Sequence, residues 1–176
     1  MRLTTSAYRP YSSAMPLAVL VIAAAWALPA PVTLDGVSRV TPGMTPHQVE
    51  ARWAIPLQLG APVGAPGSTC RTADVRVGAL HGYALFEGGR LGAVFFDRGA
   101  RTRSGIAIGS SEAALRRTYP GRLRRQPHQY VHGGHYYFLR RRRAPHWRIR
   151  FDTNGRGRVT QIGFGARAVA YVEGCA

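Results

Sequence analysis

A glycine-centred pattern occurs twice in this chain and constrains the fold more than any other feature of the sequence. The two copies span residues 40–53 and 106–119. In each copy an apolar residue lies three positions before a glycine, and polar residues that can cap a helix follow it. An aliphatic residue and an aromatic residue then follow four positions apart, so both occupy one face of a helix. The residues that this pattern predicts to be buried are Val49, Trp53, Leu115 and Tyr119.

Alternating patterns typical of strands follow each predicted helix. Strands are predicted over residues 71–77, 81–87 and 90–97, and then over residues 123–130, 136–142, 147–152 and 158–163. Gly88 and Gly89 indicate a tight hairpin turn, and residues 151–159 repeat that turn later in the chain. We therefore predict an α+β fold of two tandem units. Each unit is a short helix packed on an antiparallel sheet, with one sheet face covered by the helices and the other open.

The N-terminal residues have the three-part form of a secretory signal. Arg2 and Arg9 precede an uncharged apolar run, and Ala25 and Ala27 fit the small residues before a cleavage site. An uncleaved membrane anchor is the alternative. We expect an exported protein, periplasmic or secreted, with no stable membrane span after signal cleavage. The predicted segments are residues 1–27 as signal peptide, 28–37 as extended lead, 38–97 as first unit, 98–104 as bridge and 105–176 as second unit with a C-terminal tail.

The sequence contains two cysteines, Cys70 and Cys175, and both lie in the part expected to be exported. An oxidising compartment favours a bond between them. A thiol nucleophile at Cys70 is the alternative, but a disulfide that ties down the tail accounts for both residues. We therefore predict a Cys70–Cys175 disulfide.

Every basic residue apart from histidine is arginine, and 24 arginines against 8 acidic residues give a formal net charge of +16. Such a charge concentrates anionic partners near the surface and makes association depend on salt. The absence of lysine is equally consistent with a compositional bias of the genome.

The stretch from residue 136 to residue 151 is the strongest candidate for a binding surface. Near its end three apolar residues alternate with two arginines, in the order Trp147, Arg148, Ile149, Arg150 and Phe151. One face of such a strand is apolar and the other is basic. Arginines can bind carboxylates or phosphates in a forked geometry, and tyrosines add stacking area. The predicted binding residues are Tyr136, Tyr137, Arg140, Arg142, Arg148 and Arg150.

An alternative role for these arginines is to solvate the sheet and to keep its edge strands from pairing with other chains. Three nearby histidines, His128, His132 and His135, also raise the possibility of a metal site. The glycines between them predict a turn, and no carboxylate is close in sequence, so we expect no metal and no cofactor. The sequence also lacks a recognisable pairing of nucleophile and base, so we expect no enzyme activity.

The segments at residues 40–49 and 106–115 resemble the entry into the helix-plus-sheet units of two groups of proteins. These are the β-lactamase inhibitory protein and the small outer-membrane assembly lipoproteins of the SmpA/OmlA type. The resemblance covers most of residues 38–164 and implies a non-enzymatic exported domain whose antiparallel sheet offers a binding surface. The chain departs from the pattern at residues 53–56, in the missing lipid-attachment cysteine and in a disulfide that spans the units.

The function expected from these features is that of an exported binding module without catalysis. It would present a basic, aromatic sheet face to an envelope or extracellular protein. The alternative is a polyanion binder that contacts lipopolysaccharide, an acidic glycan or nucleic acid through surface charge. The salt dependence of affinity distinguishes these two functions, since binding through charge alone weakens steeply as ionic strength rises.

Overall fold

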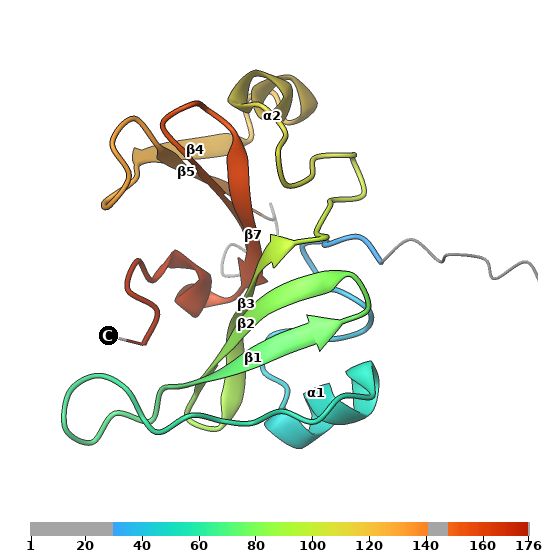
Figure 1. The fold of residues 1–176 in the computed structure, drawn as a ribbon, viewed down its shortest axis with the longest axis vertical. Coiled ribbons are helices and arrows are strands. Elements are labelled where there is room, and N and C mark those ends of the chain that lie inside the picture. The colour runs from blue at the N-terminus through green and yellow to red at the C-terminus, as the bar shows by residue number, and fades with distance from the viewer. Residues whose placement is uncertain (1–29, 141–147, 176) are drawn as a thin grey trace, which may run out of the picture.

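A computed structural model describes residues 30–140 and 148–175 (Figure 1). Seven strands form one antiparallel sheet in the order β1-β2-β3-β7-β6-β5-β4. The first three are β1 (Arg71–Val77), β2 (Leu80–Glu87) and β3 (Arg90–Arg98). The others are β4 (Leu123–Pro127), β5 (His135–Arg140), β6 (Arg148–Thr153) and β7 (Val159–Gly165). The α+β class predicted from the sequence is confirmed, and pairing of β3 with β7 joins all strands into a single sheet.

Helix α1 (Pro46–Trp53) begins at Thr45, whose side chain accepts a hydrogen bond from the backbone N–H of Gln48. The Gln48 side chain accepts a bond from the Thr45 N–H in return, so that a complete capping box fixes the start of the helix. Proline suits the first turn because it has no N–H to leave unbonded. The helix ends at Ala54 in the left-handed conformation, with φ of 53°.

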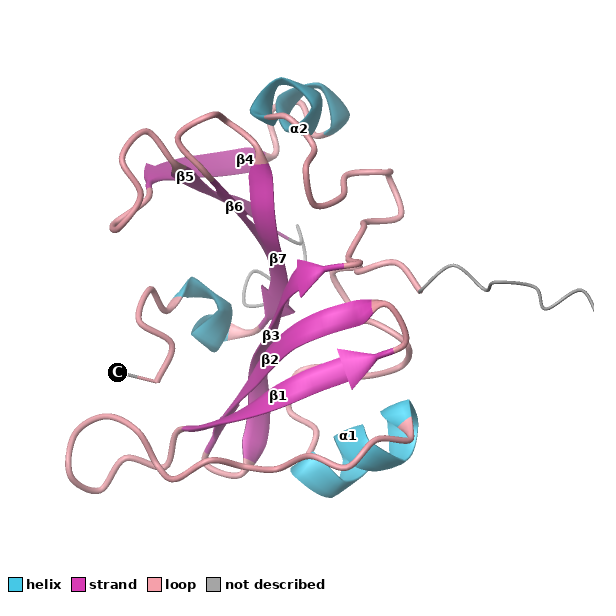
Figure 2. Ribbon diagram, in the orientation of Figure 1, coloured by secondary structure: helices cyan, strands magenta, loops and turns pink. Residues whose placement is uncertain are grey.

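Helix α2 (Glu112–Thr118) begins at Ser111, whose hydroxyl accepts a bond from the Ala114 N–H. The four residues predicted to be buried from the repeated pattern are buried in one core: Val49, Trp53, Leu115 and Tyr119. Both helices therefore cover the same face of the sheet, called here the helix face, as the sequence predicted (Figure 2).

The opposite face is covered in its central part by the C-terminal segment, which includes the 3-10 helix η1 (Arg167–Ala170). Ala168 and Val169 pack there against Leu85, Ala93 and Phe95. The expectation that this face is open is wrong in that part. This packing could not be predicted, because residues 166–175 show no pattern typical of a segment that packs on a sheet.

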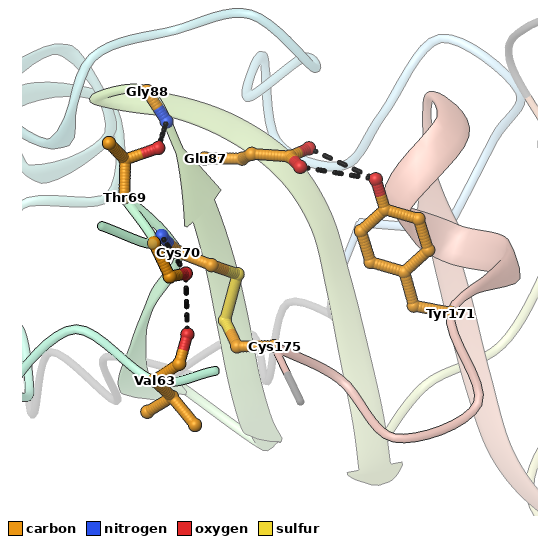
Figure 3. The surroundings of a disulfide bond; sticks show 8 residues. Val63, Thr69, Cys70, Glu87, Gly88, Tyr171 and Cys175 are labelled. Atoms are coloured by element: carbon orange, nitrogen blue, oxygen red, sulfur yellow. Dashed lines mark hydrogen bonds between the residues drawn. A yellow bond between two sulfur atoms is a disulfide. The ribbon is translucent and has the colours of Figure 1, made fainter. Parts of the chain in front are cut away.

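The predicted disulfide between Cys70 and Cys175 is confirmed, with the two Cα atoms 5.4 Å apart (Figure 3). It joins the tail to the start of β1. Two further contacts hold the same region: Thr69 Oγ1 accepts a bond from the Gly88 N–H, and the Tyr171 hydroxyl donates to the Glu87 carboxylate. The tail is therefore attached to the sheet at several points.

One predicted strand is shorter in the structure, and one predicted segment lies outside the described residues. The predicted strand at residues 123–130 ends at Pro127, since the His128 ring accepts bonds from the backbone N–H groups of Tyr130 and Val131 and turns the chain. The expected signal peptide lies outside the described residues. Across residues 30–140 and 148–175, no helix has the length and apolar character needed to cross a membrane.

Candidate anion-binding site

Three arginines meet at one end of strands β4, β5 and β6. In the antiparallel register Arg140 on β5 stands directly opposite Arg148 on β6. Arg124 on β4 stands opposite Phe138, which places it on the same sheet face as Arg140, two positions away along the neighbouring strand. We call Arg124, Arg140 and Arg148 the arginine cluster. It lies on the face opposite the helices, beyond the part that η1 covers.

The electrostatics of the cluster are unfavourable for the isolated chain. Like charges directly opposite each other on paired strands are destabilising. Burial, together with the charges of Arg140 and Arg124, lowers the pKa of Arg148. In the described part of the chain, no carboxylate forms a salt bridge with any of the three. Among the described residues, the charged form of Arg148 therefore has no negative partner of the kind that half-buried arginines normally have.

Arg148 also has a specific unsatisfied donor. Its Nε atom is buried and has no hydrogen-bond partner among residues 30–140 and 148–175. A buried donor left without an acceptor costs about 1 to 3 kcal/mol, and more when the group is charged. An anion that accepts a bond from this atom removes that cost and at the same time compensates the facing charge of Arg140. Guanidinium groups bind carboxylate and phosphate oxygens in a forked geometry, so these are the groups that the cluster fits.

Arg150, the next arginine on β6, occupies the same face but is buried, with 3% of its surface exposed. Its Nε and Nη2 atoms donate to the Asp152 carboxylate at 2.7 Å each. Its Nη1 atom donates to the carbonyls of Val169 at 3.2 Å and Tyr171 at 2.6 Å. The predicted alternation along β6 is correct, since Ile149 and Phe151 enter the core of the helix face. The prediction that Arg150 is an open binding residue is wrong, because the C-terminal segment covers it.

The two predicted binding tyrosines are also buried. Tyr136 lies beneath the His128 ring, with ring centroids 4.2 Å apart, and its own ring faces the Arg150 guanidinium. Tyr137 lies on the helix face, where its hydroxyl donates to Glu112 at 2.8 Å. Neither ring is free to stack on a partner, so an open aromatic surface is not formed by these residues. Arg142 and Trp147 lie outside the described residues.

The histidines do not gather around a common point. His135 donates from Nδ1 to Glu112 at 2.8 Å, whereas the His128 ring stacks on Tyr136 on the other face. His132 is exposed. Within residues 30–140 and 148–175 no group of three potential metal ligands is present.

Glu112 collects hydrogen bonds at the start of α2. Burial alone would raise the pKa of its carboxyl, but bonds donated by Thr153, His135 and Tyr137 outweigh burial and lower the pKa. The Thr153 hydroxyl lies 2.6 Å from Oε1, and both oxygens are used. This arrangement joins α2 to β5 and β6, so we assign it a structural role.

Arg124 is the cluster residue that sequence reasoning missed. Residues 124 and 125 are both arginine, and the β4 register decides which of them shares a face with Arg140. Arg125 lies opposite Tyr137 and so belongs to the helix face. The doubled arginine in a weakly predicted strand was the available signal, but it could not be used without the strand pairing.

Comparison with known proteins gives no independent indication of the ligand. The chain matches no protein-family model, no curated protein and no solved structure.

Proposed function

We propose that this chain is an exported binding protein without catalysis and that its arginine cluster binds anionic groups of an envelope or extracellular partner. The observation that carries the proposal is the direct opposition of Arg140 and Arg148, where the buried Nε atom of Arg148 has no hydrogen-bond partner in the described part of the chain. A native sheet seldom places like charges opposite each other without compensation, and a bound anion supplies it. Absence of a transmembrane helix among the described residues and the presence of a disulfide are compatible with export.

A polyanion fits the cluster better than a protein with a mixed surface. The three arginines lie on adjacent strands, which are spaced about 4.8 Å apart, and so form a row across the sheet. Such a row suits a polymer or surface that presents several phosphate, sulfate or carboxylate groups. The tyrosines and Arg150, which were expected to contact a protein partner, are buried. Lipopolysaccharide, acidic glycans and nucleic acids share the required chemistry.

Tandem units also form part of this proposal, and corresponding contacts of the two glycine motifs support it. Gly43 and Gly109 have φ of 92° and 89°, in the region that favours glycine. Each donates its N–H at 2.7 Å to the carbonyl of the residue that follows the hairpin arginine, Leu91 or Val159. Their carbonyls in turn accept bonds from Arg90 and Arg158, at 3.4 Å and 3.3 Å. The entry to each helix is thus attached to a hairpin by the same two kinds of hydrogen bond.

Binding of heparin, used as a sulfated probe, tests the proposal. The test variant is the double change Arg140→Gln and Arg148→Gln, and the matched control is Arg52→Gln with Arg117→Gln, which removes the same charge from exposed helix positions. We expect the test variant to lose affinity at least about tenfold relative to the control, as two charge-assisted contacts are lost. The wild-type affinity should fall steeply with salt, and uncharged dextran should not bind. Equal loss in both variants would show that only net charge matters and would overturn the assignment to this cluster.

A further inference from the structure

Strand β1 is one edge of the sheet, and only part of its outer side is covered. The Val63 N–H donates to the Cys70 carbonyl and the Gly60 N–H donates to the Thr72 carbonyl, both at 2.9 Å. Backbone groups of alternate residues in a strand point to the same side, so those of Asp74 and Arg76 also point outward. Among the described residues no backbone group bonds to this outer side at Asp74 or Arg76. The second half of β1 is therefore an open sheet edge.

A groove of about 620 Å³ runs along this open edge, between β1 and residues 55–60. Ile55, Leu57 and Leu59 of the facing segment pack against the core that the helices cover. The side chains of Asp74 and Arg76 are exposed, and they alternate with the buried Val75. Asp74 and Arg76 thus line the groove on the β1 side.

The other edge of the sheet is protected by its composition. Strand β4 carries Arg124 and Arg125 and ends at Pro127, and repeated charge with proline is typical of edges that resist pairing. The open part of β1 carries one acid and one base instead, so its local charge is balanced. An edge of this kind can accept another strand by β-augmentation.

We propose that this edge pairs with the same strand of a second copy of the chain, in antiparallel orientation and centred on Val75. In that register Asp74 stands opposite Arg76 of the second copy, and Arg76 stands opposite its Asp74. Both pairs consist of outward-pointing residues, so each pair exchanges two backbone hydrogen bonds. The interface is self-complementary, as a two-fold dimer requires.

Charge also selects this register over its neighbours. A shift by two residues in either direction keeps the outward-pointing groups aligned but sets Asp74 against Asp74 or Arg76 against Arg76, and like charges directly opposite are destabilising. The net positive charge of the chain opposes association at long range, and moderate ionic strength screens that repulsion. The arginine cluster lies at the other end of the sheet order, so dimerisation and anion binding are independent.

Charge reversal tests the pairing by sedimentation equilibrium at moderate ionic strength. We expect the wild type to dimerise, and Asp74→Arg or Arg76→Asp alone to weaken dimerisation at least about tenfold, because each makes both cross-strand pairs repulsive. The double variant with both changes should recover the wild-type dimer, since acid again faces base. An equimolar mixture of the two single variants should form a heterodimer for the same reason. Circular dichroism and melting temperature check that these exposed changes leave the fold intact.

Three outcomes would overturn the proposal. One is a wild-type chain that stays monomeric at every concentration tested. Another is a double variant that fails to recover the dimer while its fold is intact. The third is an Asp74→Arg variant that dimerises as tightly as the wild type while its fold is intact. The Arg140→Gln and Arg148→Gln variant should dimerise normally, so failure of anion binding and failure of dimerisation are distinguishable.

Discussion

Arg150 and Asp152 lie two residues apart on the same face of β6 and form a bidentate ion pair with both bonds at 2.7 Å. The guanidinium also lies 4.6 Å from the centre of the Phe95 ring and 4.8 Å from that of Tyr136. Its Nη1 atom donates to two carbonyls of the C-terminal segment, those of Val169 and Tyr171. One buried arginine thus joins β6, β3, β5 and the tail, which makes it a stabilising residue and not a surface ligand.

Replacing Arg150 should therefore destabilise the fold. Arg150→Gln leaves the Asp152 carboxylate buried without its partner, and removal of one member of a buried pair costs about 3 to 5 kcal/mol. Arg156→Gln is the control, since Arg156 is exposed in the turn between β6 and β7 and surface changes alter stability by about 0.5 kcal/mol or less. Urea unfolding of both variants measures the difference. Equal midpoints for Arg150→Gln and the wild type would contradict the burial of this pair.

Glu112 should make stability depend on pH. Its pKa is lowered in the folded chain, so its contribution is fully present above the pKa of the unfolded chain and is lost as pH falls through the folded pKa. Glu112→Gln should cost about 2 to 3 kcal/mol near neutral pH, where bonds to the charged carboxylate are lost. The difference in unfolding free energy between wild type and variant should become smaller under acid conditions. Urea unfolding over a pH series measures this, with Asp97→Asn at an exposed position as control, and a constant difference would contradict it.

The packing of the helices gives a further test of the repeated pattern. Trp53 is 5% exposed and its ring lies 6.4 Å from that of Phe96, while Leu115 is fully buried. Truncation of either residue to alanine should cost about 2 to 5 kcal/mol, because a cavity remains in the core. Thermal unfolding measures the loss. Ala113→Gly, at an exposed position of α2, should cost only about 1 kcal/mol and shows the effect of helix propensity alone.

The sequence allowed most of the secondary structure to be predicted because each element carries its own local signal. Thr45 and Ser111, polar residues that follow the two motif glycines, cap the helices. The glycine pair at 88 and 89 turns the hairpin between β2 and β3, as expected. The pairing of β3 with β7 has no such signal, since it joins residues that are far apart in the chain and alternate no differently from the other strands.

The candidate site was predicted less well because exposure depends on what covers a strand. The alternation of Arg148 and Arg150 with apolar residues placed both arginines on one face, which is correct. Period-two patterning cannot tell that the tail lies over Arg150 and not over Arg148, since the tail has no periodic pattern of its own. Arg124 joined the cluster through the β4 register, which is likewise a property of the tertiary structure.

The disulfide should matter more for the C-terminal segment than its position at the end of the chain suggests. Cys70 and Cys175 are 105 residues apart, and closing a loop of this length stabilises by up to about 4 to 5 kcal/mol in the chain-entropy model. The double change to alanine should lower the unfolding free energy by part of that amount, because Arg150 and Glu87 still hold the tail through Val169 and Tyr171. Backbone amides at residues 167–175 should then exchange faster in the alanine variant than in the wild type, with a smaller change in β2 and β3. Unchanged exchange in the tail of the alanine variant would show that the polar contacts alone fix it to the sheet.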